Sequence, residues 1–170
     1  MLFPERCNLF GDLANVKYLK KCLPDVEFIE TDFENEPVFA TDDEVHFIYM
    51  GSMTERMQEK TIQKLNQYKE RIDELIKRQT VFLFTGNSFE IFGDYIEDDR
   101  KIPGLGLIDI YSKREMFNRY NDLFLGEMEG LKIVGFKSQF SHSYTNNEAI
   151  GFCKIIKGIG LNKESRIRRY

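Results

Sequence analysis

Two short apolar runs that each stop at a glycine turn constrain the fold more than any other feature of this sequence. The first run is His46-Phe47-Ile48-Tyr49-Met50, which ends at Gly51, and the second is 80–84, which ends at Thr85-Gly86-Asn87. Continuous apolar runs of this length, stopped by glycine, are typical of parallel strands that are covered on both faces of a sheet. The sequence therefore predicts two buried parallel strands, 46–50 and 80–84.

The segment between these runs has the pattern of an amphipathic helix. From about Thr54 to Arg78, apolar residues recur at three- and four-residue steps, with Glu, Lys and Gln on the opposite face. Strand, helix and strand at this spacing form a βαβ unit, whose crossover is right-handed. Upstream, the same reasoning predicts a helix over 15–22 and a strand over 26–30.

The pattern changes after Gly93. Short runs separated by Gly or Asn predict antiparallel strands added to the sheet, with polar loops at 97–100 and 145–148. These strands are expected over 105–111, 122–127, 131–138 and 152–157. With no repeat and no long linker, the prediction is one α/β domain over 1–170. Its expected fold is an open, mostly parallel, flavodoxin-like sheet with helices on both faces, extended by antiparallel strands in the C-terminal half.

Composition excludes several classes of protein. The 170 residues are 42% hydrophobic and 31% charged, a soluble globular balance, and no run approaches the roughly 18 apolar residues of a membrane helix. A net charge of −4 argues against a nucleic-acid or anionic-membrane surface. Three cysteines without paired spacing, and no leader segment, indicate the reducing cytoplasm. The two distant histidines predict no metal site, and no cofactor is expected.

Two turns are the first candidates for a functional site. In an open parallel sheet, ligands bind beyond the carboxyl ends of the strands, where Gly51-Ser52-Met53-Thr54 and Thr85-Gly86-Asn87-Ser88 lie. A short helix, 89–93, follows the second turn. Strand, glycine turn and helix form the geometry of a nucleophile elbow, which lifts one side chain above the sheet. The pattern alone favours the other reading, a plain turn in which Gly86 and Asn87 only adopt unusual dihedral angles.

Five segments, in order along nearly the whole chain, carry a family resemblance: 2–15, 49–58, 84–93, 104–109 and 133–136. The first contains Asn-Leu-Phe-Gly-Asp, the second is similar to a Gly-Gly-Gly-Gln-Asp-x-Glu-Gln loop, and the third to an Ile-Cys-Gly-Gly-Tyr-Gln-x-Leu-Gly elbow. Together they resemble the class I glutamine amidotransferase domains of the cobyric acid synthase type. Within that type they resemble the glutaminase subunits of lipid II isoglutaminyl synthase.

The resemblance implies a glutaminase that supplies ammonia to a carboxylate acceptor, in cobalamin biosynthesis or in bacterial cell-wall synthesis. It implies a Mur-ligase-like, ATP-using partner subunit and a glutamine-like small molecule as ligand. It also implies a set of substrate-binding positions, which are Gly51, Ser52, Gly86, Asn87, Glu90 and Gln139.

The departures from the family pattern concern its catalytic residues. Gly86 stands where the family has its nucleophilic cysteine, while Asn87 and Glu90 replace a glycine and a glutamine. Gln139 lies where the family reads Gly-Phe-Glu-Asn-His-Gly, and the chain stops before the Tyr-Leu-His-Gly segment that holds the general base. Since cysteine–histidine chemistry needs both groups, we expect ordinary glutaminase activity to be lost. The loss has three possible explanations, which are natural divergence, an engineered Cys-to-Gly substitution and a fragment of a longer gene. The coordinated changes at Gly86, Asn87, Glu90 and Gln139 favour natural divergence over a single engineered substitution.

An inactive relative, or pseudoenzyme, would keep a partner-binding or ligand-binding role. The alternative is an active hydrolase or transferase of the same fold that uses the hydroxyl of Ser88 or Thr85 with His142. A third hypothesis is a plain flavodoxin-like module that binds an anion at the turn after the second strand.

The remaining cysteines and histidine are expected to be structural. Cys7 is interpreted as a small buried thiol, because no histidine accompanies it in the sequence. Cys22 on the first helix and Cys153 in the last strand are expected in the core. His46 opens a strand, which favours a structural role.

Overall fold

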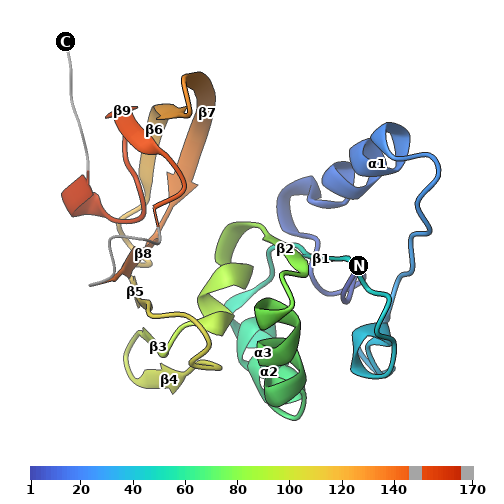
Figure 1. Ribbon diagram of the computed structural model, residues 1–170. Helices are drawn as coiled ribbons and strands as arrows, with labels where there is room; N and C mark the ends of the chain where they lie inside the picture. Colours follow the sequence, from blue (N-terminus) through green and yellow to red (C-terminus); the bar gives the residue numbers. More distant parts are fainter. Residues whose placement is uncertain (146–150, 166–170) are drawn as a thin grey trace. The chain divides into compact units, whose positions relative to one another are not determined.

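The computed structural model describes residues 1–145 and 151–165, and the chain divides into two compact units, Met1–Ile91 and Phe92–Tyr170 (Figure 1). It is a mixed α/β fold in which a parallel strand pair belongs to the first unit and mainly antiparallel strands to the second. None of the helices in the described residues has the length and hydropathy needed to cross a membrane.

The centre of the first unit is a parallel pair of strands, β1 (Phe47–Met50) and β2 (Val81–Phe84). Their register runs from Phe47 opposite Val81 to Met50 opposite Phe84, which confirms the two predicted parallel strands. Val81 N donates to the His46 carbonyl at 3.0 Å, just before β1 begins. Ile48, Tyr49 and Met50 are all buried, as expected for a strand covered on both faces. The burial predicted for the second strand is wrong, because Val81 and Leu83 of β2 are 53% and 39% exposed.

The start of the chain lies along the other side of β1. Leu2 N donates to the Tyr49 carbonyl at 2.9 Å, and Phe3 N donates to the Thr31 carbonyl at 2.7 Å. A strand over 26–30 was predicted, and this is wrong, because only a single bridge between Leu2 and Thr31 forms there. Val26 stays 51% exposed, so no sheet face buries the run that looked like a strand.

Three helices surround this pair: α1 (Leu13–Cys22), α2 (Glu55–Asn66) and α3 (Lys69–Lys77). α1 confirms the helix predicted over 15–22, and Thr54 caps α2 by accepting from Met57 N at 3.3 Å. The single helix predicted over 54–78 is two helices. At Tyr68 the backbone leaves the helical region (φ −109°, ψ 13°), and its ring packs edge-on against buried Phe39. A short 3₁₀ helix follows β2 over Gly86–Phe92, three residues earlier than predicted.

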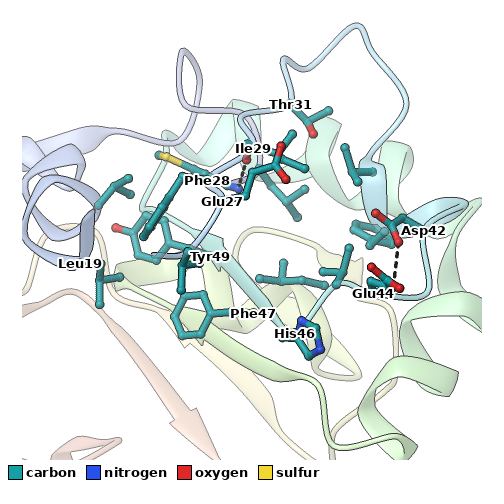
Figure 2. Close-up of a pocket in the computed structure, with 18 of the residues that line it drawn as sticks. Leu19, Glu27, Phe28, Ile29, Thr31, Asp42, Glu44, His46, Phe47 and Tyr49 are labelled. Atoms are coloured by element: carbon teal, nitrogen blue, oxygen red, sulfur yellow. Dashed lines mark hydrogen bonds between the residues drawn. The ribbon is translucent and has the colours of Figure 1, made fainter. Parts of the chain in front are cut away.

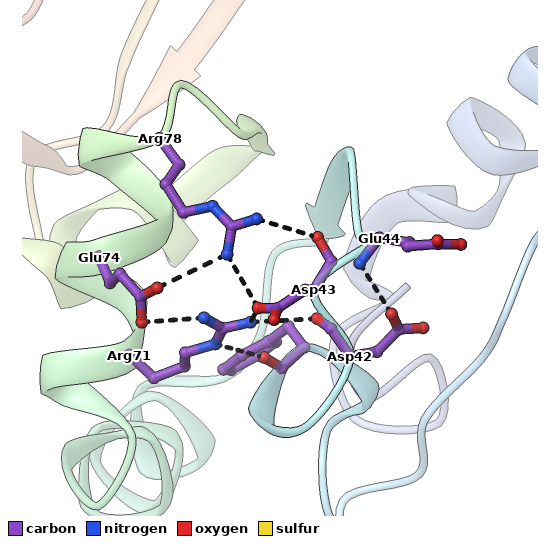
Figure 3. Close-up of polar contacts among 7 residues, drawn as sticks. Asp42, Asp43, Glu44, Arg71, Glu74 and Arg78 are labelled. Atoms are coloured by element: carbon purple, nitrogen blue, oxygen red, sulfur yellow. Dashed lines mark hydrogen bonds and ion pairs between the residues drawn. The ribbon is translucent and has the colours of Figure 1, made fainter.

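An arginine on α3 holds the loop before β1 against the helix through hydrogen bonds (Figure 3). Arg71 donates to the carbonyls of Phe39 and Asp42 at 2.9 and 3.1 Å and to the Asp43 carboxylate at 2.7 Å. Arg78 adds a second guanidinium at 2.8 Å from the same Asp43 oxygen. Hydrogen bonds from Arg71 and Arg78 hold the pKa of Asp43 below its ordinary value.

The second unit holds two sheets in its described residues. One has the order β4-β3-β5-β8 and the other β7-β6-β9. The bounds are β3 Tyr95–Glu97, β4 Lys101–Pro103, β5 Tyr111–Arg114, β6 Tyr120–Met128, β7 Leu131–Gln139, β8 Ser141–Tyr144 and β9 Lys154–Lys157. The hairpin of β6 and β7 confirms the strands predicted over 122–127 and 131–138. β9 confirms the last predicted strand, although it begins at Lys154 instead of Phe152.

Several predictions for this half are wrong. The antiparallel strands were expected to extend the parallel sheet, but in the described residues they pair with one another. The run 105–111 is mostly a loop, because Leu107 N and Ile108 N both donate to the Phe92 carbonyl and fold the chain back. The polar loop predicted at 97–100 is present as the turn of the β3–β4 hairpin. The two strands of this hairpin were not predicted from the sequence. The loop predicted at 145–148 lies outside the described residues except for Thr145.

Candidate functional site

The turns that follow β1 and β2 interlock at the carboxyl ends of the two strands. Asn87 forms a pair of hydrogen bonds with the backbone of Met53, in which Met53 N donates to Oδ1 at 3.0 Å and Nδ2 donates to the Met53 carbonyl at 2.8 Å. Gly86 faces Ser52 across the same junction. The structure therefore brings together four of the predicted binding positions, Gly51, Ser52, Gly86 and Asn87, in the first unit.

The two glycines of this junction are places of close approach. Gly86 has a φ of +61°, and a Cβ built on it would lie 2.5 Å from the Ser52 Cβ. A Cβ on Gly51 would lie 2.2 Å from the Cys7 carbonyl oxygen. Real Cβ atoms do not approach other atoms so closely, and a positive φ itself disfavours an L side chain. Both positions therefore require glycine in this conformation.

A carboxylate that sequence reasoning missed holds the first turn. Asp12 Oδ2 accepts from Ser52 N at 2.5 Å and from the Ser52 hydroxyl at 2.6 Å. The Asp12 carbonyl accepts from the Tyr49 hydroxyl at 3.0 Å, which links the same residue to β1. The Asn-Leu-Phe-Gly-Asp segment was the available signal, because it places Asp12 just before α1, but no role followed from it.

The two hydroxyl candidates have backbone and tyrosine partners. Ser88 is fully buried, and its Oγ lies 2.7 Å from the Thr85 carbonyl and 3.1 Å from the Met50 carbonyl. Thr85 Oγ1 shares a hydrogen bond with the Tyr49 hydroxyl at 3.3 Å. A hydroxyl nucleophile needs a base that accepts its proton. Among the described residues of the first unit, neither hydroxyl has a histidine or carboxylate as hydrogen-bond partner.

Beneath the second turn lies a buried polar pair from α2 and the 3₁₀ helix. Gln58 is fully buried, and its Nε2 donates to the Asn87 carbonyl at 2.6 Å and to Glu90 Oε2 at 3.1 Å. Glu90 is only 4% exposed, so this predicted binding position lies inside the unit. The expectation that Gln residues of this helix face outward is wrong for Gln58, because its amide satisfies the backbone of the turn.

The prediction of a buried cysteine side chain is confirmed for Cys7 and wrong for Cys22. Cys7 is buried, with its Sγ 4.0 Å from the Met53 sulfur. Burial, helped by the negative charges of Glu5 and Asp12, raises the pKa of its thiol to about 12, so it stays protonated. Cys22 is exposed at the end of α1 rather than in the core, and Cys153 is half-buried.

The second unit brings together the other two predicted residues, His142 and Gln139. His142 lies fully buried in β8, its Nδ1 3.0 Å from Gln139 Nε2 and its ring edge-on to Tyr120. With the amide donating, Nδ1 accepts, so the neutral ring carries its proton on Nε2. That atom has no hydrogen-bond partner among the described residues. Burial lowers the pKa of His142, and Lys163 and Lys137 add to this effect while Glu115 opposes it.

The first unit also contains a cavity of about 570 Å³ between α1, the 23–31 segment and the approach to β1 (Figure 2). Figure 2 shows Leu19 at one end and Asp42 with Glu44 at the other. The lining is mainly apolar, with exposed His46 at its edge. The described residues contain no group of three or more His, Cys, Asp or Glu arranged to hold a metal ion.

Comparison with known proteins gives one informative similarity. The chain matches no protein-family profile. It is 25% identical over 168 residues to the lipid II isoglutaminyl synthase (glutamine-hydrolyzing) subunit GatD of Staphylococcus aureus (strain N315). The alignment covers 95% of this chain and 67% of the relative. Over most of its length, the chain is therefore distantly similar to a subunit of a glutamine-hydrolyzing synthase, which suggests a glutamine amidotransferase-like protein.

Proposed function

We propose that this chain is a single glutamine amidotransferase-like domain, of the cobyric acid synthase type and flavodoxin-like layout, that does not hydrolyse glutamine. The geometry at Gly86 is the observation that supports this proposal. Glycine has no side chain that could attack, and a Cβ at that position would lie 2.5 Å from the Ser52 Cβ, so position 86 presents no nucleophile. Gly86 takes the place of the catalytic cysteine in the family that the sequence resembles.

Two neighbouring groups, the Cys7 thiol and the Ser88 hydroxyl, are poor substitutes for that cysteine. The Cys7 thiol, with a pKa of about 12, is protonated at neutral pH, and a thiol attacks as its thiolate. The Ser88 hydroxyl is buried against two carbonyl oxygens. The turn nevertheless keeps a fixed shape through Asp12 and Asn87, which suits it to hold a small glutamine-like molecule or a partner segment.

The test of this proposal is ammonia release from glutamine by the full chain. We expect none above background, either alone or with the ligase subunit of a lipid II isoglutaminyl synthase and ATP. Cys7→Ser serves as the matched variant, because it removes the buried thiol of this region. Release by the unmodified chain that disappears in Cys7→Ser would overturn the proposal and identify the thiol as the nucleophile. Release that survives in Cys7→Ser would overturn it as well.

The relative is named as a subunit, and we propose the same kind of assembly here. The partner would be a Mur-ligase-like, ATP-using protein of the cytoplasm that acts in cell-wall synthesis. Co-purification of this chain with such a ligase subunit tests the assembly separately from catalysis. A complex that forms without glutamine hydrolysis supports the binding role. Failure to bind any ligase subunit of this class would contradict it.

The alternative function, a hydrolase that uses Ser88 or Thr85 with His142, stays a prediction. The lowered pKa of His142 favours a neutral imidazole, which is the form that a general base requires. Single variants Ser88→Ala, Thr85→Ala and His142→Gln, assayed on amide and ester substrates, test this alternative. No turnover by the unmodified chain ends it.

A further inference from the structure

The β6–β7 hairpin carries an apolar stripe on one face of its sheet. Leu123 of β6 lies opposite Phe136 of β7, and Leu125 lies opposite Val134. Leu123 and Phe136 are each 65% exposed, and Val134 is 78% exposed. Within the same face, the ion pair of Glu127 with Lys132 borders the stripe at one end, and the polar pair Asn121–Ser138 borders it at the other. An apolar centre with a polar border is the pattern of a protein interface.

The strand that carries half of this stripe is an open edge. β7 is nine residues long, and in residues 1–145 and 151–165 it pairs only with β6. Natural edges are usually protected by short length, proline, bulges or charge. β7 contains no proline, and its pairing with β6 has no bulge. One of its two lysines, Lys137, is turned away from the stripe and donates to the Gly160 carbonyl at 2.6 Å.

We propose that β7 pairs with β7 of a second copy of this chain, antiparallel and about a two-fold axis at Gly135. In this register Val134 lies opposite Phe136 of the second copy, Lys132 opposite Ser138, and Ile133 opposite Lys137. No lysine meets a lysine across the axis. A cross-strand row then runs from Leu125 through Val134 to Phe136 and Leu123 of the second copy, so two half-stripes join into one apolar face.

Neighbouring registers lose this match. An axis at Val134 places Lys132 opposite Phe136, and an axis at Phe136 places Val134 opposite Ser138. Gly135 also suits the axis sterically, because a Cβ built on it would meet nothing within 4 Å. The isologous contact of a two-fold dimer needs such self-complementarity, which the Gly135 register supplies and its two neighbours do not.

Disulfide trapping tests the register directly. In a Cys22→Ser background, Gly135→Cys places the two thiols on the axis, where opposed Cα atoms lie about 4.5–5.5 Å apart, within disulfide reach. We expect a disulfide-linked dimer under mild oxidation. Leu131→Cys is the matched control, because its two copies would lie about 27 Å apart along paired strands. Equal cross-linking of both variants, or none of Gly135→Cys, overturns the proposal.

Sedimentation of the full chain tests the association itself. We expect a monomer–dimer equilibrium that Val134→Lys weakens by about tenfold or more, since a lysine would then face Phe136 of the second copy. Val81→Lys is the control, because it makes the same change at a half-exposed position of β2 in the first unit. Circular dichroism checks that both variants fold. A monomer at every concentration, or equal weakening by both variants, contradicts the β7 interface.

Discussion

Two regions of the molecule differ in how fully their polar groups are hydrogen-bonded. One is the junction of the two turns in the first unit, and the other is the buried histidine of the second unit. At the junction, Ser52, Asn87 and Ser88 each have hydrogen-bond partners at 3.1 Å or closer. In β8, the Nε2 of buried His142 has none among the described residues. A fully bonded polar cluster fixes one backbone shape, whereas a buried donor without a partner costs free energy. The lowered pKa of the buried His142 ring also makes stability depend on pH.

The largest effect is expected from Gly86→Ala. The new Cβ would combine a φ of +61° with a 2.5 Å approach to the Ser52 Cβ, and we expect a loss of about 3 kcal/mol in the free energy of unfolding. Gly11→Ala is the matched control, because Gly11 has a φ of +82° but no atom within 4 Å of its Cβ position. It should lose only about 1 kcal/mol, measured by urea denaturation. Equal losses would mean that the junction is not sterically closed.

Asp12→Ala should have the second largest effect. It removes the acceptor of both the Ser52 amide and the Ser52 hydroxyl, and it leaves the amide without that partner. We expect about 2 kcal/mol of destabilisation. Asp12→Asn keeps a side-chain oxygen as acceptor and should lose less. If both variants unfold at the same urea concentration as the parent, the carboxylate does not organise the turn.

Arg71→Ala should destabilise the first unit by freeing the loop before β1 from α3. The side chain is mostly buried and binds two backbone carbonyls as well as Asp43. Lys77→Ala is the comparison, since Lys77 makes an exposed pair with Asp73 on the same helix. Thermal unfolding should show a clear drop in Tm for Arg71→Ala and almost none for Lys77→Ala. The reverse order would contradict the assigned role.

The smallest effect is the pH dependence that His142 contributes. Because burial lowers its pKa in the folded state, the unfolded chain binds more protons below about pH 6.5, the ordinary value for histidine. The stability of the second unit should therefore fall as pH drops from 7.5 to 5.5. In His142→Gln this slope should become flatter. An unchanged slope would show that the histidine does not titrate differently on unfolding.

The sequence was informative where one residue pattern allowed one structure. The runs before Gly51 and Gly86 specified parallel strands, although only the first is buried, and the rule for strand ends correctly placed Ser52 beside Gly86. Asp12 escaped prediction because it reaches Ser52 from 40 residues earlier in the chain. Gln58 escaped because its burial depends on the Asn87 carbonyl, which no helical pattern reveals.

The second unit was harder to predict because its short apolar runs fit both strands and loops. The run 105–111 has the composition of a strand, but hydrogen bonds to the Phe92 carbonyl fold it into a loop. The β6–β7 hairpin was predictable because both of its arms are long and meet near Gly130. The exposure of Cys22 likewise depends on which face of α1 the rest of the unit covers.

The most direct test of the central claim is a double-mutant cycle between positions 52 and 86. The claim is that the Ser52 side chain closes the turn against any side chain at Gly86. Gly86→Ala should cost about 3 kcal/mol in the parent but only about 1 kcal/mol in a Ser52→Gly background, where the positive φ alone remains unfavourable. Equal costs in the two backgrounds would contradict the claim, because the Ser52 side chain would then not restrict a side chain at position 86.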